Sequence, residues 1–238
     1  MRKLVIIPTY NERENIESMI CTVLALHRFY DLLIVDDGSP DGTAEVVKAY
    51  RQQHPDRLHL IERSGKQGLG TAYLAGFRWG LQAGYDLLFE MDCDFSHNPE
   101  DLERLAAPLT SDADVAIGSR YVKGGHVVNW PLSRLLISWC GSLYVRLVTW
   151  MPVHDTTAGF VGYRRQALER IDFDAIRMKG YGFQVEMKYT AWQLGLRLRE
   201  IPITFTERRV GASKMSGGIF SEALWGVLKL RFRKIRGL

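Results

Sequence analysis

The segment YDLLFEMDCDFSHNPE, residues 85–100, joins an apolar run to two aspartates that stand one residue apart, Asp92 and Asp94. Residues 87–89 suit a buried strand, and polarity rises abruptly at the carboxyl end of that strand. Ligands collect at strand exits in open α/β sheets, and two adjacent carboxylates favour a hard cation such as Mg²⁺ or Mn²⁺. The same pair would also suit the cap of a helix that begins near Pro99. The segment alone leaves both interpretations open.

Strand and helix patterns alternate through the first half of the chain, on both sides of this segment. Apolar runs end in polar or turn-forming residues, and helical periodicity follows most of them. The expected strands are residues 4–7, 32–35, 58–61, 87–89 and 115–118, and the expected helices end near residues 26, 53, 81 and 109. This alternation predicts an α/β fold with a mostly parallel central sheet and helices on both faces.

A glycine-rich turn, GKQGLGTAY at residues 65–73, precedes the third of these helices. Gly65, Gly68 and Gly70 do not match the Gly-x-Gly-x-x-Gly spacing of a dinucleotide site, and they do not follow the first strand. No Lys-Ser or Lys-Thr pair follows the last glycine, so a phosphate-binding P-loop is not indicated. We expect a tight turn and close packing of the helix.

The pattern changes after residue 121. RLLISWCGSLYVRLVTWM, residues 134–151, carries a wide apolar face and a thin polar stripe, as a helix lying half in an apolar medium would. We expect an interfacial helix at about 133–151, although an ordinary core helix has a similar pattern. A second amphipathic helix is expected at about 219–238, and its basic face, formed by Lys229, Arg233 and Arg236, suits an anionic membrane surface. No window approaches the roughly 20 apolar residues of a membrane span.

Between these helices the sequence places further polar segments. HDTTAGFVGYRRQALERI, residues 154–171, is expected to form a loop with one acid and then a helix, followed by a helix at 181–193 and a strand at 197–205. In ERRVGASKM, residues 207–215, Arg208 and Lys214 flank small residues. Such a loop suits a lid that closes two positive charges over phosphate oxygens, and a solvated surface loop is the alternative.

The bulk composition predicts one globular domain spanning residues 1–238. The net charge of +4 is modest, with basic residues crowded near the C-terminus, and that end is expected to attract anions. No recognised nucleic-acid motif is present, so we expect no nucleic-acid partner. The three cysteines lack metal-ligand spacing, and no signal-peptide pattern begins the chain. We therefore expect a cytoplasmic protein with peripheral membrane contact.

The strand exits together resemble the inverting glycosyltransferases of family 2, which have the GT-A fold that binds nucleotide-diphospho-sugars. The motifs are similar in order and spacing to those of polyprenol-phosphate (dolichol-phosphate) mannosyltransferases, from about residue 3 to residue 232. They are PTYNERENI, VDDGSPDGT, GLGTAY, MDCDFSHNPE, GSRYVKGG, NWPLSR and GASKM.

This resemblance implies roles for individual residues. The catalytic residues would be Asp92, Asp94, Arg208 and Lys214. The nucleotide-sugar site comprises Pro8, Tyr10, Glu12, Val35, Asp37, Asp92, Cys93, Asp94, Gln184, Arg208 and Lys214. The metal ligands are Asp92, Asp94 and Ser96, with Ser96 standing where some relatives carry glutamine; the lipid phosphate is received by Arg120, Ser133 and Arg134.

The implied reaction is transfer of mannose from GDP-mannose to a polyprenyl (dolichyl or undecaprenyl) phosphate, with inversion, a Mg²⁺ or Mn²⁺ cofactor and release of GDP. It would take place at the cytoplasmic face of a membrane, reached through the two amphipathic helices or a membrane-anchoring partner subunit. The acceptor phosphate is already anionic at neutral pH, so no strong general base is needed, and Asp155 is the fallback base or an orienting group.

Three other functions remain open on the sequence. The first is a polyprenyl-phosphate glucosyltransferase that uses a UDP-sugar. The second is a sugar nucleotidyltransferase, which normally carries a basic glycine-rich loop after the first strand, where this chain has PTYNERENI. The third is a catalytically silent membrane-binding module.

Overall fold

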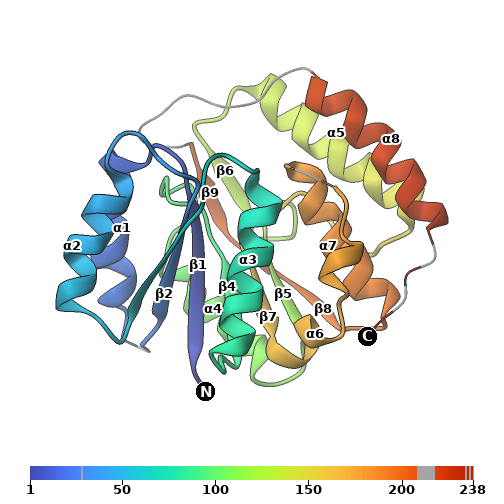
Figure 1. Cartoon of the computed structure of the whole chain (residues 1–238). Coiled ribbons are helices and arrows are strands. Elements are labelled where there is room, and N and C mark those ends of the chain that lie inside the picture. The colour runs from blue at the N-terminus through green and yellow to red at the C-terminus, as the bar shows by residue number, and fades with distance from the viewer. Residues whose placement is uncertain (28, 179, 208–217, 234, 236, 238) are drawn as a thin grey trace.

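The computed structural model of the chain describes residues 1–27, 29–178, 180–207, 218–233, 235 and 237. A seven-stranded sheet forms its centre (Figure 1). In spatial order its strands are β3 (Leu58–Glu62), β2 (Asp31–Asp36), β1 (Lys3–Thr9), β4 (Leu87–Glu90), β7 (Val161–Arg164), β5 (Val115–Ser119) and β8 (Leu198–Pro202). β7 runs antiparallel to both of its neighbours, and the other pairings are parallel, as the expected α/β fold requires.

Helices cover both faces of this sheet. On one face lie α1 (Arg13–Leu24), α2 (Thr43–Gln53) and α4 (Asp101–Leu109). On the other lie α3 (Leu69–Gln82), α6 (Arg165–Glu169), a 3₁₀ turn (Phe173–Ala175) and α7 (Tyr181–Gln193), with α5 (Leu132–Thr149) and α8 (Gly218–Phe232) packed beyond them. Figure 1 shows α5 and α8 side by side at one end of the molecule.

Two apolar cores follow from the period of two along the central strands. In β1, Leu4 and Ile6 belong to the core beneath α3 and α7, whereas Val5 and Ile7 belong to the core beneath α1 and α4. All four side chains are fully buried. A strand buried on both faces reads as a continuous apolar run, which is why residues 4–7 were recognised from sequence.

The segment around residues 161–164 departs from the sequence-based expectation. We expected a loop leading into a helix, but Val161–Arg164 form β7, an antiparallel strand in the middle of the sheet. Its four residues are too few to establish a period. Gly162 makes the position possible, because a Cβ there would come within 2.6 Å of the Phe89 ring.

The strand expected at 197–205 is divided. Leu198–Pro202 extend the central sheet as β8, and β9 (Thr204–Thr206) pairs with β6 (His126–Val128) in a separate two-stranded parallel sheet. Chain direction changes around Ile203, which is buried. The small sheet carries the chain from the central sheet towards α5.

The two amphipathic helices differ slightly from their expected limits. α5 covers Leu132–Thr149 rather than about 133–151, and α8 ends at Phe232 rather than near residue 238. Beyond α8, Gly237 forms an antiparallel bridge with Ile171, so the chain turns back onto the domain. Among the described residues, no helix has the length and apolar character needed to cross a bilayer.

Candidate active site

The carboxyl ends of β1, β2 and β4 meet at one edge of the sheet, because these three parallel strands are neighbours. The chain after β4 carries Asp92 and Asp94 to this edge. The Asp92 side chain is 39% exposed, whereas Asp94 is only 7% exposed. The edge therefore combines one accessible carboxylate with one largely buried one.

Both carboxylates are oriented by neighbouring groups. The Tyr73 hydroxyl donates a long hydrogen bond of 3.4 Å to Asp92 Oδ1, and burial raises the pKa of that hydroxyl well above its ordinary value, so it remains a donor. The backbone N–H of Ser96 donates to Asp94 Oδ1 at 3.0 Å. His97 Nδ1 lies 4.0 Å from Asp92 Oδ2. Neither aspartate caps α4, whose N-cap residue is Glu100 and has no side-chain cap bond.

The donor set at this edge fits a hard divalent cation. Within the described part of the chain, no group of three or more His, Cys, Asp or Glu side chains could hold a metal alone. Mg²⁺ is often held by one or two carboxylates, with substrate phosphates and water completing the shell. Ser96 Oγ is buried and has no hydrogen-bond partner among the described residues, which leaves it available as a weak ligand.

The nucleotide-side residues surround the exits of β1 and β2. Tyr10 follows β1, and the Lys66 ammonium lies 5.0 Å from the centre of its ring. Asp37 accepts hydrogen bonds from Arg63 Nε at 2.6 Å and from the Gln67 backbone N–H at 3.1 Å. Asp37 therefore holds the glycine-rich turn against the sheet as well as facing this edge.

The glycine-rich turn packs as expected. Gly65 and Gly68 have φ values of +153° and +102°, which favour glycine. Gly70 lies against Phe183 of α7, where a Cβ would come within 2.8 Å of the ring. Two cations at this turn were not singled out from the sequence: Arg63, which precedes the turn and pairs with Asp37, and Lys66, which lies within it over the Tyr10 ring. Lys66 is visible in the sequence within GKQG, residues 65–68, but that segment was interpreted only as a turn.

The remaining expected nucleotide-side residues differ in exposure. Pro8 and Glu12 are partly exposed, whereas Val35 and Cys93 are buried. Burial raises the pKa of the Cys93 thiol well above its usual range, so this cysteine is not a thiolate nucleophile. Gln184, on α7, is almost fully buried. Arg208 and Lys214 lie outside the described residues.

Two buried charges that the sequence did not reveal lie behind this edge. The Lys188 ammonium, on α7, donates to the backbone carbonyls of Ala158 at 2.6 Å and Gln184 at 3.2 Å. Burial lowers the pKa of Lys188 to about 8, and burial raises the pKa of Glu90 on β4 to about 8. The charge of each group opposes the effect of burial on the pKa of the other. Lys188 therefore links α7 to the loop that precedes β7.

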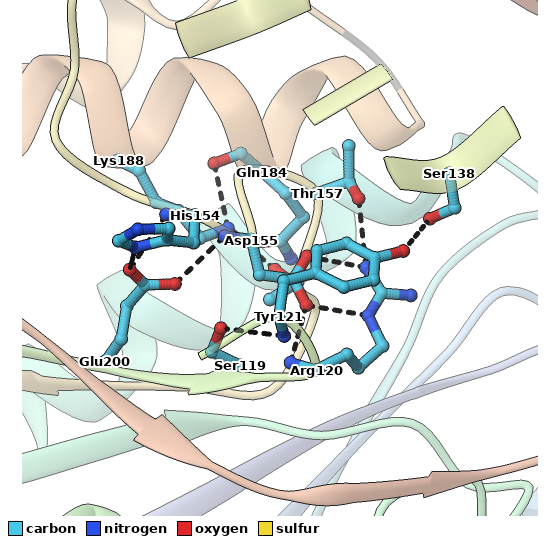
Figure 2. A network of polar contacts seen from close by, with 11 residues as sticks. Ser119, Arg120, Tyr121, Ser138, His154, Asp155, Thr157, Gln184, Lys188 and Glu200 are labelled. Atoms are coloured by element: carbon cyan, nitrogen blue, oxygen red, sulfur yellow. Dashed lines mark hydrogen bonds and ion pairs between the residues drawn. The ribbon is translucent and has the colours of Figure 1, made fainter. Parts of the chain in front are cut away.

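The second half of the site is built on Arg120 (Figure 2). Its backbone N–H and Nε donate to Asp155 Oδ2 at 2.9 and 2.7 Å, and its Nη2 donates to Oδ1 at 2.6 Å. Nη2 also donates to Thr157 Oγ1 at 3.0 Å. The backbone N–H groups of His154 and Asp155 donate in turn to the Glu200 carboxylate at 2.8 and 2.9 Å.

Aromatic rings surround the Arg120 guanidinium. Its carbon lies 5.2 to 5.5 Å from the ring centres of Tyr121, Trp130 and Phe205. The guanidinium is consequently buried, and its position is fixed by Asp155 and by these rings.

The other expected acceptor-side residues lie at the start of α5. The Arg134 guanidinium lies 4.1 Å from the Trp130 ring centre and forms an ion pair with Glu207 at 2.5 Å. Ser133 is exposed beside it. Ser138, one turn later, accepts a hydrogen bond from the Tyr121 hydroxyl at 2.7 Å and was not expected in the site. The structure thus brings both Arg120 and Arg134 against the Trp130 ring.

Large apolar side chains are exposed on the outer surface of α5 and α8. The Arg231 guanidinium, on α8, lies 4.5 Å from the centre of the Trp150 ring, which joins the two helices at one end. The exposed side chains on and beside these helices are Leu132, Leu136, Ile137, Trp139, Leu147, Trp150, Trp225 and Phe232. Exposed apolar side chains gathered on one pair of helices are typical of an interaction face.

Arg233 was expected on the basic, membrane-facing side of α8, but its side chain contacts the rest of the domain. Arg233 forms an ion pair with Glu186, which is fully buried in α7, and donates to the carbonyl of Ala175 at 3.1 Å. It therefore holds the end of α8 onto the domain, whereas Lys229 is exposed. Arg236 lies outside the described residues.

Comparison with known proteins identifies the family. Residues 4–172 match the model of glycosyl transferase family 2. The chain is 48% identical to polyprenol monophosphomannose synthase of Mycolicibacterium smegmatis, covering 100% of this chain and 91% of that protein. It is 51% identical to undecaprenyl-phosphate mannosyltransferase of Micrococcus luteus, covering 96% and 93%.

More distant proteins extend the same picture. Dolichol-phosphate mannosyltransferase of Pyrococcus furiosus is 36% identical over 97% of this chain, which spans 64% of that protein. A structure of glucosyl-3-phosphoglycerate synthase from Mycobacterium tuberculosis with Mn²⁺, UDP and glucosyl-3-phosphoglycerate superposes with a TM-score of 0.71, at 18% identity, covering 96% of this chain and 80% of that one. That likeness confirms the GT-A fold. The chain is a member of glycosyltransferase family 2, with a GT-A fold.

Proposed function

We propose that this protein transfers mannose from GDP-mannose to a polyprenyl phosphate, giving polyprenyl-phosphate mannose and GDP with inversion at the anomeric carbon. The observation that carries the proposal is where the acidic and the basic residues lie in the fold. A carboxylate pair suited to a metal-bound diphosphate follows β4, and Arg120 and Arg134 both contact Trp130, next to the start of a helix with exposed apolar side chains. The names of the three mannosyltransferase relatives support mannose and the lipid phosphate.

Asp92 and Asp94 would hold Mg²⁺ or Mn²⁺, with Ser96 Oγ as a third oxygen or as a contact through water. When bound, the cation offsets the negative charge that develops on the departing nucleoside diphosphate. Mn²⁺ and UDP occur together in the glucosyl-3-phosphoglycerate synthase structure, which supports a divalent ion at this edge of the fold. Arg208 and Lys214 enter the proposal as further phosphate contacts on the strength of their motif alone.

The acceptor phosphate has a second ionisation near pH 6, so it is an anionic nucleophile at neutral pH. Arg134 and Arg120 would bind it and offset its repulsion from the donor diphosphate. Asp155 is fully buried, and both of its oxygens accept hydrogen bonds from Arg120. We therefore assign Asp155 to orienting Arg120 rather than to general base catalysis.

The polyprenyl chain would lie against the exposed apolar face of α5 and α8. Trp139 and Trp225 suit the boundary between lipid headgroups and acyl chains, and the exposed Lys229 suits anionic headgroups. We place this face at the cytoplasmic side of a membrane, as a peripheral contact or with a membrane-anchoring partner.

A donor panel tests the proposal. The purified protein is incubated with a short polyprenyl phosphate, Mg²⁺ or Mn²⁺, and GDP-mannose, UDP-glucose or UDP-N-acetylglucosamine. We expect transfer from GDP-mannose, release of GDP and loss of activity with a chelator. Preferential transfer from UDP-glucose would replace the proposal with the glucosyltransferase alternative, and release of inorganic diphosphate would indicate a nucleotidyltransferase. The anomeric configuration of the product, measured by NMR, tests inversion.

A further inference from the structure

His97 is a buried polar side chain that the reaction described above does not use. It is 3% exposed, and its Nδ1 has no hydrogen-bond partner among the described residues. A buried donor or acceptor without a partner destabilises the folded state, because it has lost its hydrogen bonds to water. A side chain that serves only to fill the core at this position would carry no polar atom, so the imidazole calls for an explanation.

The unpartnered nitrogen faces the metal-suited acid. His97 Nδ1 lies 4.0 Å from Asp92 Oδ2, about one ångström beyond an ordinary hydrogen bond. The other oxygen of this carboxylate accepts from the Tyr73 hydroxyl at 3.4 Å, which is also long. A small rotation of the Asp92 side chain would shorten one or both contacts. Asp92 is 39% exposed and has room for such a rotation.

The imidazole itself is held in place from two sides. The Phe160 ring stacks on it with 5.0 Å between ring centres, and the Phe205 ring meets it edge-on at 5.2 Å. The backbone N–H of Thr206 donates to the carbonyl of Ser96 at 3.1 Å, which ties the preceding residue to β9. The ring is therefore fixed, and Asp92 is the partner that moves.

We propose that His97 is a positioning residue for the metal site, and that its Nδ1–H donates to Asp92 Oδ2 when Asp92 binds the divalent cation. The bond fixes the carboxylate rotamer and leaves Oδ1 directed at the ion. Ligating carboxylates generally have such partners, whose loss costs about 10–100-fold in metal affinity. This inference rests on the proposed function, because it assigns Asp92 to a cation that accompanies the donor diphosphate.

The test compares variants that keep or remove the donor. His97→Phe fits a site already lined by aromatic rings but has no N–H, and His97→Asn places an amide N–H close to the Nδ1 position. His97→Gln carries its amide one bond further out. Mn²⁺ affinity is measured by titration calorimetry in the presence of GDP, and near-ultraviolet circular dichroism checks the fold.

We expect His97→Phe and His97→Gln to weaken Mn²⁺ binding about 10–100-fold, and His97→Asn to retain affinity within about threefold of the unaltered protein. Equal affinity in all four proteins would overturn the inference and leave the proposed function intact. Loss of affinity in His97→Asn to the level of His97→Gln would overturn the assigned donor. If the unaltered protein bound no Mn²⁺ with GDP, the metal assignment in the proposed function and this inference would both fail.

Discussion

Arg120 and Asp155 form a two-pronged ion pair in the interior of the protein, with Nε 2.7 Å from Oδ2 and Nη2 2.6 Å from Oδ1. Asp155 is fully buried, and Thr157 accepts a third hydrogen bond from the same guanidinium. A buried ion pair of this geometry fixes the direction of the arginine. Arg120 is thus held in place by the protein itself, as its proposed role in acceptor binding requires.

Asp155→Asn should destabilise the fold by about 3–5 kcal/mol, because it leaves the buried Arg120 charge without its partner. Urea unfolding, followed by fluorescence, measures the change. Asp112→Asn is the matched control: it also removes a carboxylate that pairs with an arginine, Arg199, but at the surface, and it should leave the unfolding midpoint unchanged.

The same variant distinguishes an orienting group from a general base. If Asp155 orients Arg120, KM for the polyprenyl phosphate rises in Asp155→Asn and the pH profile keeps its shape. If Asp155 were the base, the variant would lose kcat with the KM unchanged, and the acidic limb of the profile would disappear.

Asp92→Ala and Asp94→Ala should each abolish transfer while leaving the protein folded. Asp92 is partly exposed and contributes no core packing, so its removal costs little stability. Initial rates with GDP-mannose, alongside near-ultraviolet circular dichroism, test both statements. Near-normal activity in either variant would refute the metal assignment.

Glu207→Gln should lower KM for the polyprenyl phosphate severalfold. In the structure the Glu207 carboxylate forms an ion pair with the Arg134 guanidinium, and both side chains are about 30% exposed. An incoming phosphate must compete with this carboxylate, and the amide competes less well. Glu169→Gln, which alters an ion pair with Arg165 on α6, is the control and should leave KM unchanged. An increase in KM would show that Glu207 assists acceptor binding.

Lys188→Met should destabilise the fold by about 3–5 kcal/mol, because it strands Glu90 as an unpaired buried acid. Adding Glu90→Gln to it should recover part of this loss. A double-mutant cycle by urea unfolding measures the coupling, expected at about 0.5–3 kcal/mol. Additive effects of the two substitutions would show that the two charges do not interact.

The sequence predicted the fold where the signal is local. Residues 4–7 formed an apolar run of the length of a buried strand, and the helices expected at residues 43–53 and 181–193 have the same bounds in the structure. β7 was missed because four residues, including Gly162, carry no period. Its place between β4 and β5 depends on contacts that are remote in sequence.

The same limit applies to the site. Asp92 and Asp94 were found because a carboxylate pair at a strand exit is a local pattern. His97, Lys188 and Arg63 act through partners that only the fold brings near them. The basic C-terminal helix shows the converse: Arg233 was expected at a membrane surface, but the buried Glu186 holds it on the domain. Charge reversal there would report on stability rather than on lipid contact.

Membrane contact is best tested on the exposed tryptophans. Trp139 is 49% exposed and Trp225 67% exposed. About half or more of each side chain is therefore available to contact a lipid surface. Trp139→Ala and Trp225→Ala should each weaken partition into anionic liposomes about tenfold, by the transfer free energy of a large apolar side chain. Phe29→Ala is the matched control. Phe29 is 73% exposed, beside the amino end of β2, and its removal should leave cosedimentation unchanged.

Because the exposed Lys229 is also expected to meet anionic headgroups, Lys229→Glu should add to the loss on anionic vesicles and have little effect on neutral ones. Unchanged cosedimentation in both tryptophan variants would show that the face of α5 and α8 meets a protein partner rather than the bilayer.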